Sequence, residues 1–307
     1  MSKSHGLSTT EIQPTCIVSP MEQIVQLISA LNSVVDSSDS MYRAYACAPA
    51  EDSLACREVL EHDEELASTT RMPTPLFGAY VDAEFKLHLL NDLVRSFTSL
   101  VAKTDVNLGE MVIARSVIEV AARMHWGLAF NDDYRERASR WLREWLRIIA
   151  ETKKLGEDPL VFVEGLGNEM LIREGAASAG LNVPGPPPGT IDLVWMVMTA
   201  KPGQLRFQGL KREDVVAVFY RKLSAVTHGS MLGVHPQFAD PRADTSNRST
   251  ASRPSEILTL IAGVLTAYAN AHDALNELYG WDSSSMKSAI DEAVDEINTA
   301  YKHFAAP

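Results

Sequence analysis

Cysteine is scarce in this sequence, and the few cysteines form no cross-linking or metal-binding pattern. The 307 residues include Cys16, Cys47 and Cys56, and no Cys-x-x-Cys pair occurs. An odd, sparse set of this kind excludes a disulfide framework and a zinc ribbon. A chain of this length can bury a sizeable core without such cross-links. We therefore expect a protein of the reducing cytoplasm.

Long apolar runs and an excess of basic residues are also missing. The first ten residues, MSKSHGLSTT, are polar and lack the apolar stretch of a signal peptide. The longest apolar run, at residues 257–269, is too short to cross a bilayer. A net charge of -12 argues against broad, sequence-independent binding to nucleic acid, although it leaves room for a local basic site. We expect no membrane partner.

The common cofactor and metal motifs are absent as well. No Gly-x-Gly-x-x-Gly, Walker loop or Gly-x-Ser-x-Gly elbow occurs. No histidine follows a glutamate by three residues, as a di-iron bundle requires. No two histidines lie three or four residues apart, so a zincin-type site is also excluded. The sequence therefore predicts no cofactor.

The sequence does contain strong helical periodicity. Sustained alternation of the strand type is nearly absent, whereas apolar residues recur every three to four positions. The segment 108–130 is apolar around most of its circumference, which is typical of a central helix. The fold class is therefore all-α, a multi-helix bundle. The predicted helices begin at Pro20 and after Pro75, and otherwise cover 51–66, 108–130, 134–150, 159–179, 190–200, 212–229, 255–279 and 284–304.

One domain is expected after a short tail. Residues 1–19 are rich in Ser, Thr and Pro and predict a flexible tail. Residues 20–307 are expected to form a single helical domain, because too few helices follow the Pro/Gly connector at 181–190 to build a separate core. The connector is the alternative sub-boundary. Residues 233–254 form a polar stretch that predicts a mobile or functional loop.

The segment 212–231 carries a polar stripe suited to phosphodiester chemistry. At about 100° per residue, Asp214, Arg221, Ser224 and His228 lie on one side of the helix. Arg221 is a permanent cation, and His228 titrates near neutrality. His228 would act as general base or acid, and Arg221 would stabilise the transition state without a metal. Ser224 would bond a phosphate oxygen, and Asp214 would orient Arg221.

The same stripe also has a purely structural interpretation. It can be a solvated polar face whose histidine, next to Gly229, interacts favourably with the negative end of the helix dipole.

A resemblance favours the chemical interpretation. Arg221 and His228 are similar to the Arg-x(4–6)-His signature of HEPN-domain proteins, within Tyr220-Arg221-Lys222-Leu223-Ser224…His228-Gly229. An upstream Arg and Glu four apart, here Arg115 and Glu119, also resemble that family, and the likeness spans about 108–232. It implies a HEPN-like core with extra N- and C-terminal helices, a homodimer with a composite site, and a metal-independent endoribonuclease of defence or toxin–antitoxin systems. Lys222 departs from the family, in which a small polar residue often follows the arginine.

Arg115 and Glu119 interrupt an otherwise apolar helix and have two interpretations. They can form a structural ion pair at i,i+4 in the core. Alternatively they form a pocket wall with Arg123 and Trp126, because charges inside a bundle often mark sites.

A second motif suggests metal chemistry. Asp132, Asp133 and Glu136 match the Asp-Asp-x-x-Glu letters of class I terpene synthases, whose carboxylates hold magnesium against a diphosphate. The other interpretation is a helix N-cap, because Asp side chains there accept free amide protons.

Three functions therefore remain open from the sequence. The first is an endoribonuclease with an RNA substrate. The second is a non-catalytic interaction or regulatory module of the same fold, with a protein partner and the 233–254 loop as a docking segment. The third is a magnesium-dependent small-molecule enzyme in a helical bundle.

Overall fold

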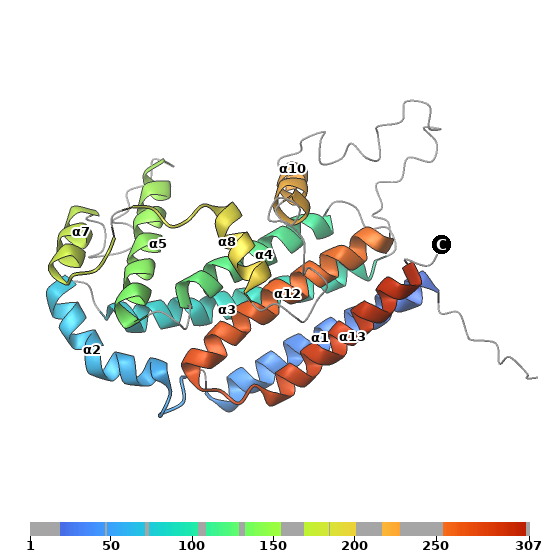
Figure 1. Cartoon of the computed structure of the whole chain (residues 1–307), viewed down its shortest axis with the longest axis horizontal. Helices are drawn as coiled ribbons and strands as arrows, with labels where there is room; N and C mark the ends of the chain where they lie inside the picture. The colour runs from blue at the N-terminus through green and yellow to red at the C-terminus, as the bar shows by residue number, and fades with distance from the viewer. Residues whose placement is uncertain are drawn as a thin grey trace, which may run out of the picture.

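A computed structural model describes residues 19–46, 48–70, 74–103, 109–128, 133–154, 169–183, 185–200, 217–227 and 254–304. Every regular element within these ranges is helical, and none is a strand, which confirms the all-α class (Figure 1). In chain order the elements are α1 (Pro20–Ala44), α2 (Leu54–Thr70), α3 (Pro75–Val101), α4 (Gly109–Leu128), α5 (Tyr134–Lys154), α7 (Glu169–Ser178), α8 (Thr190–Thr199), η1 (Ala217–Lys222), α10 (Leu223–Thr227), α12 (Pro254–Tyr279) and α13 (Ser284–Phe304).

Two helices, α4 and α12, form the centre of the bundle. They pack along each other, and α4 also contacts α3, α5, α8 and α10, as the sequence led us to expect of a central helix. The more enclosed of the two is α12, which contacts α1, α2, α3, α8 and α13 as well. Every residue of α12 from Ile257 to Asn276 is buried except Thr259 and Thr266. A helix that is apolar on all sides is expected at such a position.

The first and last helices pair along one edge of the molecule. In Figure 1, α1 and α13 lie side by side beneath α12, and the two are in extensive contact. The predicted start of α1 at Pro20 is confirmed, with Ser19 as its N-cap. The Ser19 Oγ accepts from the Glu22 amide at 3.2 Å, and the Glu22 carboxylate accepts from the Ser19 amide at 2.7 Å. This capping box satisfies two amides that the helix leaves free.

The start of α3 is held by a residue from α2. Asp63 is buried, and its carboxylate accepts from the amides of Leu76 at 2.8 Å and Phe77 at 3.3 Å. Burial raises the pKa of Asp63, and the two backbone bonds oppose that shift. Because a carboxylate at a helix N-terminus also meets the positive end of the dipole, Asp63 fixes the angle between α2 and α3.

Helices on both sides of the Pro/Gly connector share one core. Apolar side chains of α8, α12 and α13 join the same buried cluster as those of α1, α3, α4 and α5. Before the connector, the close approach at Gly175 ties α7 to α2, because a Cβ there would lie 2.1 Å from the Thr70 carbonyl oxygen. The connector thus joins parts of one packed unit.

Several predicted segments lie outside the described residues. These include nearly all of the tail at 1–19, residues 159–168 of the predicted helix at 159–179, and nearly all of the loop at 233–254. Within the described part of the chain, no helix has the length and apolarity needed to span a membrane.

Candidate functional site

Arg221 lies on the outer face of a short helical segment that packs on the bundle through two apolar side chains. Phe219 and Leu223 are each 1% exposed, whereas Arg221 is exposed and Tyr220 and Ser224 are half-buried. The described residues of this segment therefore have one apolar and one polar face, as the sequence predicts. Asp214 and His228 lie outside the described residues.

The prediction of a continuous α-helix at 212–229 is wrong in one respect. Residues Ala217–Lys222 form a π-helical turn, η1, and the chain is α-helical only from Leu223 to Thr227. A π-helix bonds i to i+5, so its rotation per residue is smaller than the roughly 100° of an α-helix, on which the predicted polar stripe depends. The angular alignment of Arg221 with Ser224 is therefore altered. Such turns occur frequently at functional sites.

A glycine on α12 makes room for this segment. A Cβ at Gly263 would lie 2.3 Å from the Phe219 ring, closer than any side chain tolerates. The ring therefore sits directly on the α12 backbone, and this contact fixes how η1 is placed over the core.

The structure brings Arg115 and Glu119 next to the Arg221 segment. The predicted pair is present, with Arg115 Nε 2.7 Å from Glu119 Oε1, and both side chains are partly exposed. The Arg115 guanidinium also lies 5.6 Å from the centre of the Tyr220 ring, a cation–π distance. Its Nη1 atom is buried without a hydrogen-bond partner in the described structure. The pair thus contributes to the surface that carries Arg221.

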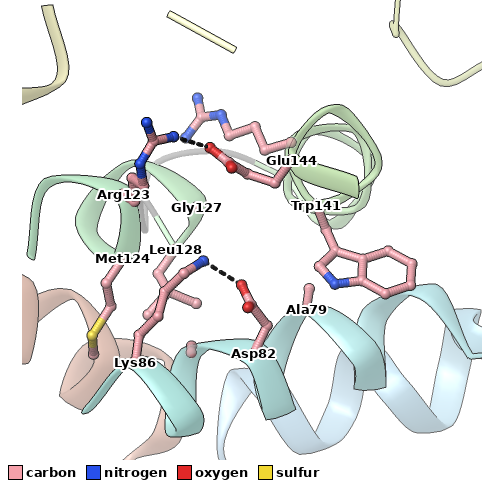
Figure 2. Close-up of a pocket in the computed structure, with 11 residues that line it drawn as sticks. Ala79, Asp82, Lys86, Arg123, Met124, Gly127, Leu128, Trp141 and Glu144 are labelled. Carbon is pink, nitrogen blue, oxygen red and sulfur yellow. Dashed lines mark hydrogen bonds and ion pairs between the residues drawn. The ribbon is translucent and has the colours of Figure 1, made fainter. Parts of the chain in front are cut away.

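Arg123 belongs to a different place, a cleft between α3, α4 and α5 (Figure 2). The space that its walls enclose is small, about 20 Å³, and the cleft is otherwise open to solvent at its mouth. Two ion pairs face each other across the opening. Lys86 pairs with Asp82 on α3, and Arg123 Nη1 lies 2.8 Å from Glu144 Oε1 of α5.

Apart from Arg140, the remaining lining of the cleft is apolar and closely packed. Met124 and Leu128 are almost fully buried, and Trp141 is 8% exposed. The Trp141 ring packs on Gly78, where a Cβ would lie 2.6 Å from it. The floor of the cleft is therefore a rigid apolar surface beneath charged walls.

Trp126, grouped with Arg123 in the sequence, does not line this cleft. It is 3% exposed and lies beneath Arg140, whose guanidinium is 5.5 Å from the ring centre. Arg140 Nη1 also donates to the Trp126 carbonyl at 2.6 Å. Trp126 thus supports Arg140, which does line the cleft.

The carboxylates of the alternative metal motif have other partners. Asp133 Oδ1 accepts from the Glu136 amide at 2.9 Å, the contact of a helix N-cap. Glu136 Oε1 lies 3.2 Å from Arg140 Nε and 4.0 Å from Arg143 Nη2. Asp132 is outside the described residues, and the described ranges contain no group of three or more acidic, His or Cys side chains placed to hold a metal.

Sequence reasoning missed a buried ion pair between α2 and α5. Arg137 is 1% exposed, and it bonds both carboxylate oxygens of Glu58, with Nε 3.1 Å from Oε2. The Tyr80 hydroxyl donates to the same carboxylate, and burial together with the Glu58 charge raises the pKa of Tyr80. Glu58 falls in an acidic stretch that looks solvated, so only its helical register could have indicated burial.

A second buried polar group lies on α12. His272 Nε2 is 2.7 Å from the Ser38 hydroxyl of α1, and His272 is 1% exposed. Burial lowers the pKa of His272 to about 4, despite the nearby Asp273. The imidazole is therefore neutral near pH 7. It is enclosed by the core, so it serves packing rather than surface chemistry.

No protein-family model matches the chain, and no curated protein or solved structure is found to resemble it significantly. The fold and its sites define the chain as an all-α multi-helix bundle with an exposed arginine segment and a charged cleft.

Proposed function

We propose that the protein is a metal-independent endoribonuclease that uses Arg221 and His228. The observation that supports this most directly is the placing of Arg221. It is exposed on a π-helical turn, and no salt bridge in the described part of the chain involves it. The ring of the neighbouring Tyr220 lies at a cation–π distance from the Arg115 guanidinium, so a second arginine contacts the segment that carries Arg221. Such a local cationic surface is what an acidic protein needs to contact a phosphate.

The chemistry follows from the two side chains. A base removes the proton of a ribose 2′-OH, the 2′ oxygen attacks the adjacent phosphorus, and the 5′ oxygen leaves with a proton from an acid. His228 supplies one of these proton transfers, and Arg221 stabilises the charge that develops on the phosphate oxygens. The products are a 2′,3′-cyclic phosphate and a 5′-hydroxyl. Ser224 and Asp214 assist as hydrogen-bond donor and orienting carboxylate.

The resemblance to HEPN-domain proteins supports the same proposal. In those proteins the Arg/His pairs of two chains form one site, so we expect a homodimer here. A defence or toxin–antitoxin role in the cytoplasm follows from the same likeness.

RNA cleavage in the presence of EDTA tests the proposal. We expect cleavage by the purified protein, and a loss of about 10²- to 10⁴-fold in His228→Ala and Arg221→Ala. Lys287→Ala, which removes an exposed cation on α13, is the matched control and should cleave normally. Cleavage that persists in His228→Ala, or that needs magnesium, would contradict the mechanism.

A non-catalytic interaction module is the second candidate, favoured by an apolar row on α3. Phe77, Val81, Phe85 and Leu89 recur every four residues and are 53%, 44%, 66% and 37% exposed. An apolar row of this kind on a helix is typical of a protein-binding surface. On this alternative, a biological phenotype would survive His228→Ala and be lost in Phe85→Asp.

A further inference from the structure

We propose that the cleft between α3, α4 and α5 binds a phosphate-type oxyanion, held chiefly by Arg123. The site uses neither Arg221 nor His228, so it stands whether or not the protein cleaves RNA. Four observations support it: the charges that line the cleft, the sharing of one carboxylate, the apolar floor, and the packing of Trp141.

The walls of the cleft carry more positive than negative charge. The basic residues in the lining are Lys86, Arg123 and Arg140, and the acidic residues are Asp82 and Glu144. Lys86 and Asp82 neutralise each other on α3, and Arg140 is paired with Glu136, which lies outside the lining. The excess of positive charge therefore rests on Arg123 and its neighbour Arg147, which share Glu144. The whole protein has a net charge of -12, so this local excess of cations is opposite to the overall balance.

One carboxylate is shared between two arginines. Glu144 Oε1 lies 2.8 Å from Arg123 Nη1, and its Oε2 lies 2.8 Å from Arg147 Nε. Both oxygens of Glu144 are therefore paired with guanidinium groups. The two arginines carry two positive charges, and the single carboxylate neutralises only one of them. Of the Arg123 nitrogens, only Nη1 is held by a described residue (Figure 2). The rest of the guanidinium is available for a bidentate contact with an oxyanion.

The surroundings strengthen any charge interaction at this place. The Glu144 side chain is 10% exposed and that of Arg123 is 22% exposed, above a floor that includes Met124 and Leu128. Coulombic attraction is several times stronger in such a partly dehydrated environment than in bulk water. An unbalanced guanidinium at the mouth of an apolar cleft therefore favours an anion.

The packing of Trp141 limits the size and type of ligand. The ring is 8% exposed and lies against Gly78, so it has no free face on which a base could stack. The enclosed space is only about 20 Å³, so a ligand reaches it with a small group from the open mouth. We therefore infer a compact tetrahedral oxyanion in the cleft, either free phosphate or a phosphate group of a longer ligand.

Calorimetric titration with inorganic phosphate at constant ionic strength tests the site. We expect saturable binding to the wild type and a weakening of roughly tenfold or more in Arg123→Gln, which loses a charged hydrogen-bond donor. Arg173→Gln is the matched control, because it removes a guanidinium that pairs with Glu169 and lies outside the cleft lining. We expect it to bind phosphate within about threefold of the wild type.

Glu144→Gln provides a test in the opposite direction. It removes the competing negative charge and keeps an acceptor for Arg123, so phosphate should bind more tightly, by several-fold. A variant that merely damaged the fold would bind less tightly, and circular dichroism confirms that each variant is folded.

Competition by a short single-stranded RNA then identifies the source of the phosphate. If RNA prevents the binding of inorganic phosphate to the wild type, the natural ligand is a backbone phosphate. If sulfate prevents it and RNA does not, the natural ligand is a small soluble anion. The proposal is overturned if the wild type shows no saturable binding up to about 10 mM phosphate, a dissociation constant too weak to matter. It is equally overturned if Arg123→Gln and Arg173→Gln weaken binding to the same extent.

Discussion

Arg137 and Glu58 place a full ion pair where almost no water reaches, at 1% and 9% side-chain exposure. Removing charges from water is costly, and their attraction and hydrogen bonds offset that cost only while both partners are present. Tyr80, on α3, donates to the same carboxylate, so three helices depend on this group. The pair is thus a condition for packing α2, α3 and α5 together.

We expect Arg137→Met to lower the free energy of unfolding by about 3 to 5 kcal/mol, because Glu58 would be left buried without its countercharge. Urea unfolding measures this change. The control is Arg173→Met, whose ion pair with Glu169 is about two-fifths exposed and should cost less than about 1 kcal/mol. If the double variant Glu58→Leu/Arg137→Met lost as much stability as the two single variants summed, the two side chains would not be energetically coupled.

His272 makes stability depend on pH. Its folded pKa of about 4 lies below the ordinary value of 6.5. Between these two values the unfolded chain takes up a proton that the folded protein excludes. The free energy of unfolding therefore decreases as the pH falls from about 6.5 toward 4, and the contribution of His272 to stability is fully present above 6.5.

From about pH 7 to pH 5 the loss from His272 should be about 2 kcal/mol. We expect His272→Gln, which keeps a polar group near Ser38, to show a correspondingly weaker pH dependence in urea unfolding. Raised carboxyl pKa values, such as that of Glu84, act equally on both proteins, so the difference isolates the histidine. Parallel pH profiles for the two proteins would show that His272 does not titrate as described.

At the scale of elements, the contact between Phe219 and Gly263 holds η1 on the bundle. A methyl group at Gly263 would overlap the ring, and neither α12 nor the buried ring has room to move. We expect Gly263→Ala to lower the free energy of unfolding by about 1 to 3 kcal/mol. It should also reduce any RNA cleavage, because Arg221 is two residues from Phe219.

Gly127→Ala is the matched control in thermal unfolding. No atom lies within 4 Å of a Cβ at this α4 position, so the better helix propensity of alanine should stabilise slightly, by up to about 1 kcal/mol. Equal melting temperatures for the two glycine variants would show that the Phe219 contact carries no energy.

The helices themselves could be predicted from the sequence, because their apolar spacing and stop signals are local. The Ser19-Pro20 start and the cap at Asp133 follow from residues within one turn. The π-helical turn at 217–222 could not be predicted, because no local pattern that we recognised distinguishes bonding to i+5 from bonding to i+4. Its packing against Gly263, through Phe219, joins residues far apart in the sequence.

The candidate sites also differ in how far they could be predicted from the sequence. Arg221 and its polar neighbours are visible as a pattern along one segment, whereas the cleft joins residues of α3, α4 and α5. The sequence suggests Arg123 only as a neighbour of Arg115 and Glu119, the charges that interrupt the apolar helix. Glu144, the partner of Arg123, and the opposing pair of Lys86 and Asp82 were not suggested, because ordinary surface helices carry the same residues.

For the whole molecule, the shared core predicts cooperative unfolding. Buried side chains on both sides of the Pro/Gly connector belong to one cluster, so neither part has a separate interior. We expect the helical signal in circular dichroism and tryptophan fluorescence to give coincident urea transitions. Trp126 and Trp141 report on the part before the connector, and Trp195 and Trp281 on the part after it. Two separate midpoints would instead place a domain boundary at 181–190.

The pairing of α1 with α13 also has a consequence during synthesis. The apolar face of α1, with Ile24, Leu27 and Leu31, is covered partly by α12 and α13, which follow it by more than two hundred residues. At about 5 to 20 residues per second, the ribosome takes roughly 10 to 50 s to deliver the last helix. Although α3 also contacts α1 and is synthesised early, the part of this face that α12 and α13 cover stays exposed on the nascent chain throughout that interval. The yield of the protein in a cell should therefore depend on chaperones that bind such surfaces until translation ends.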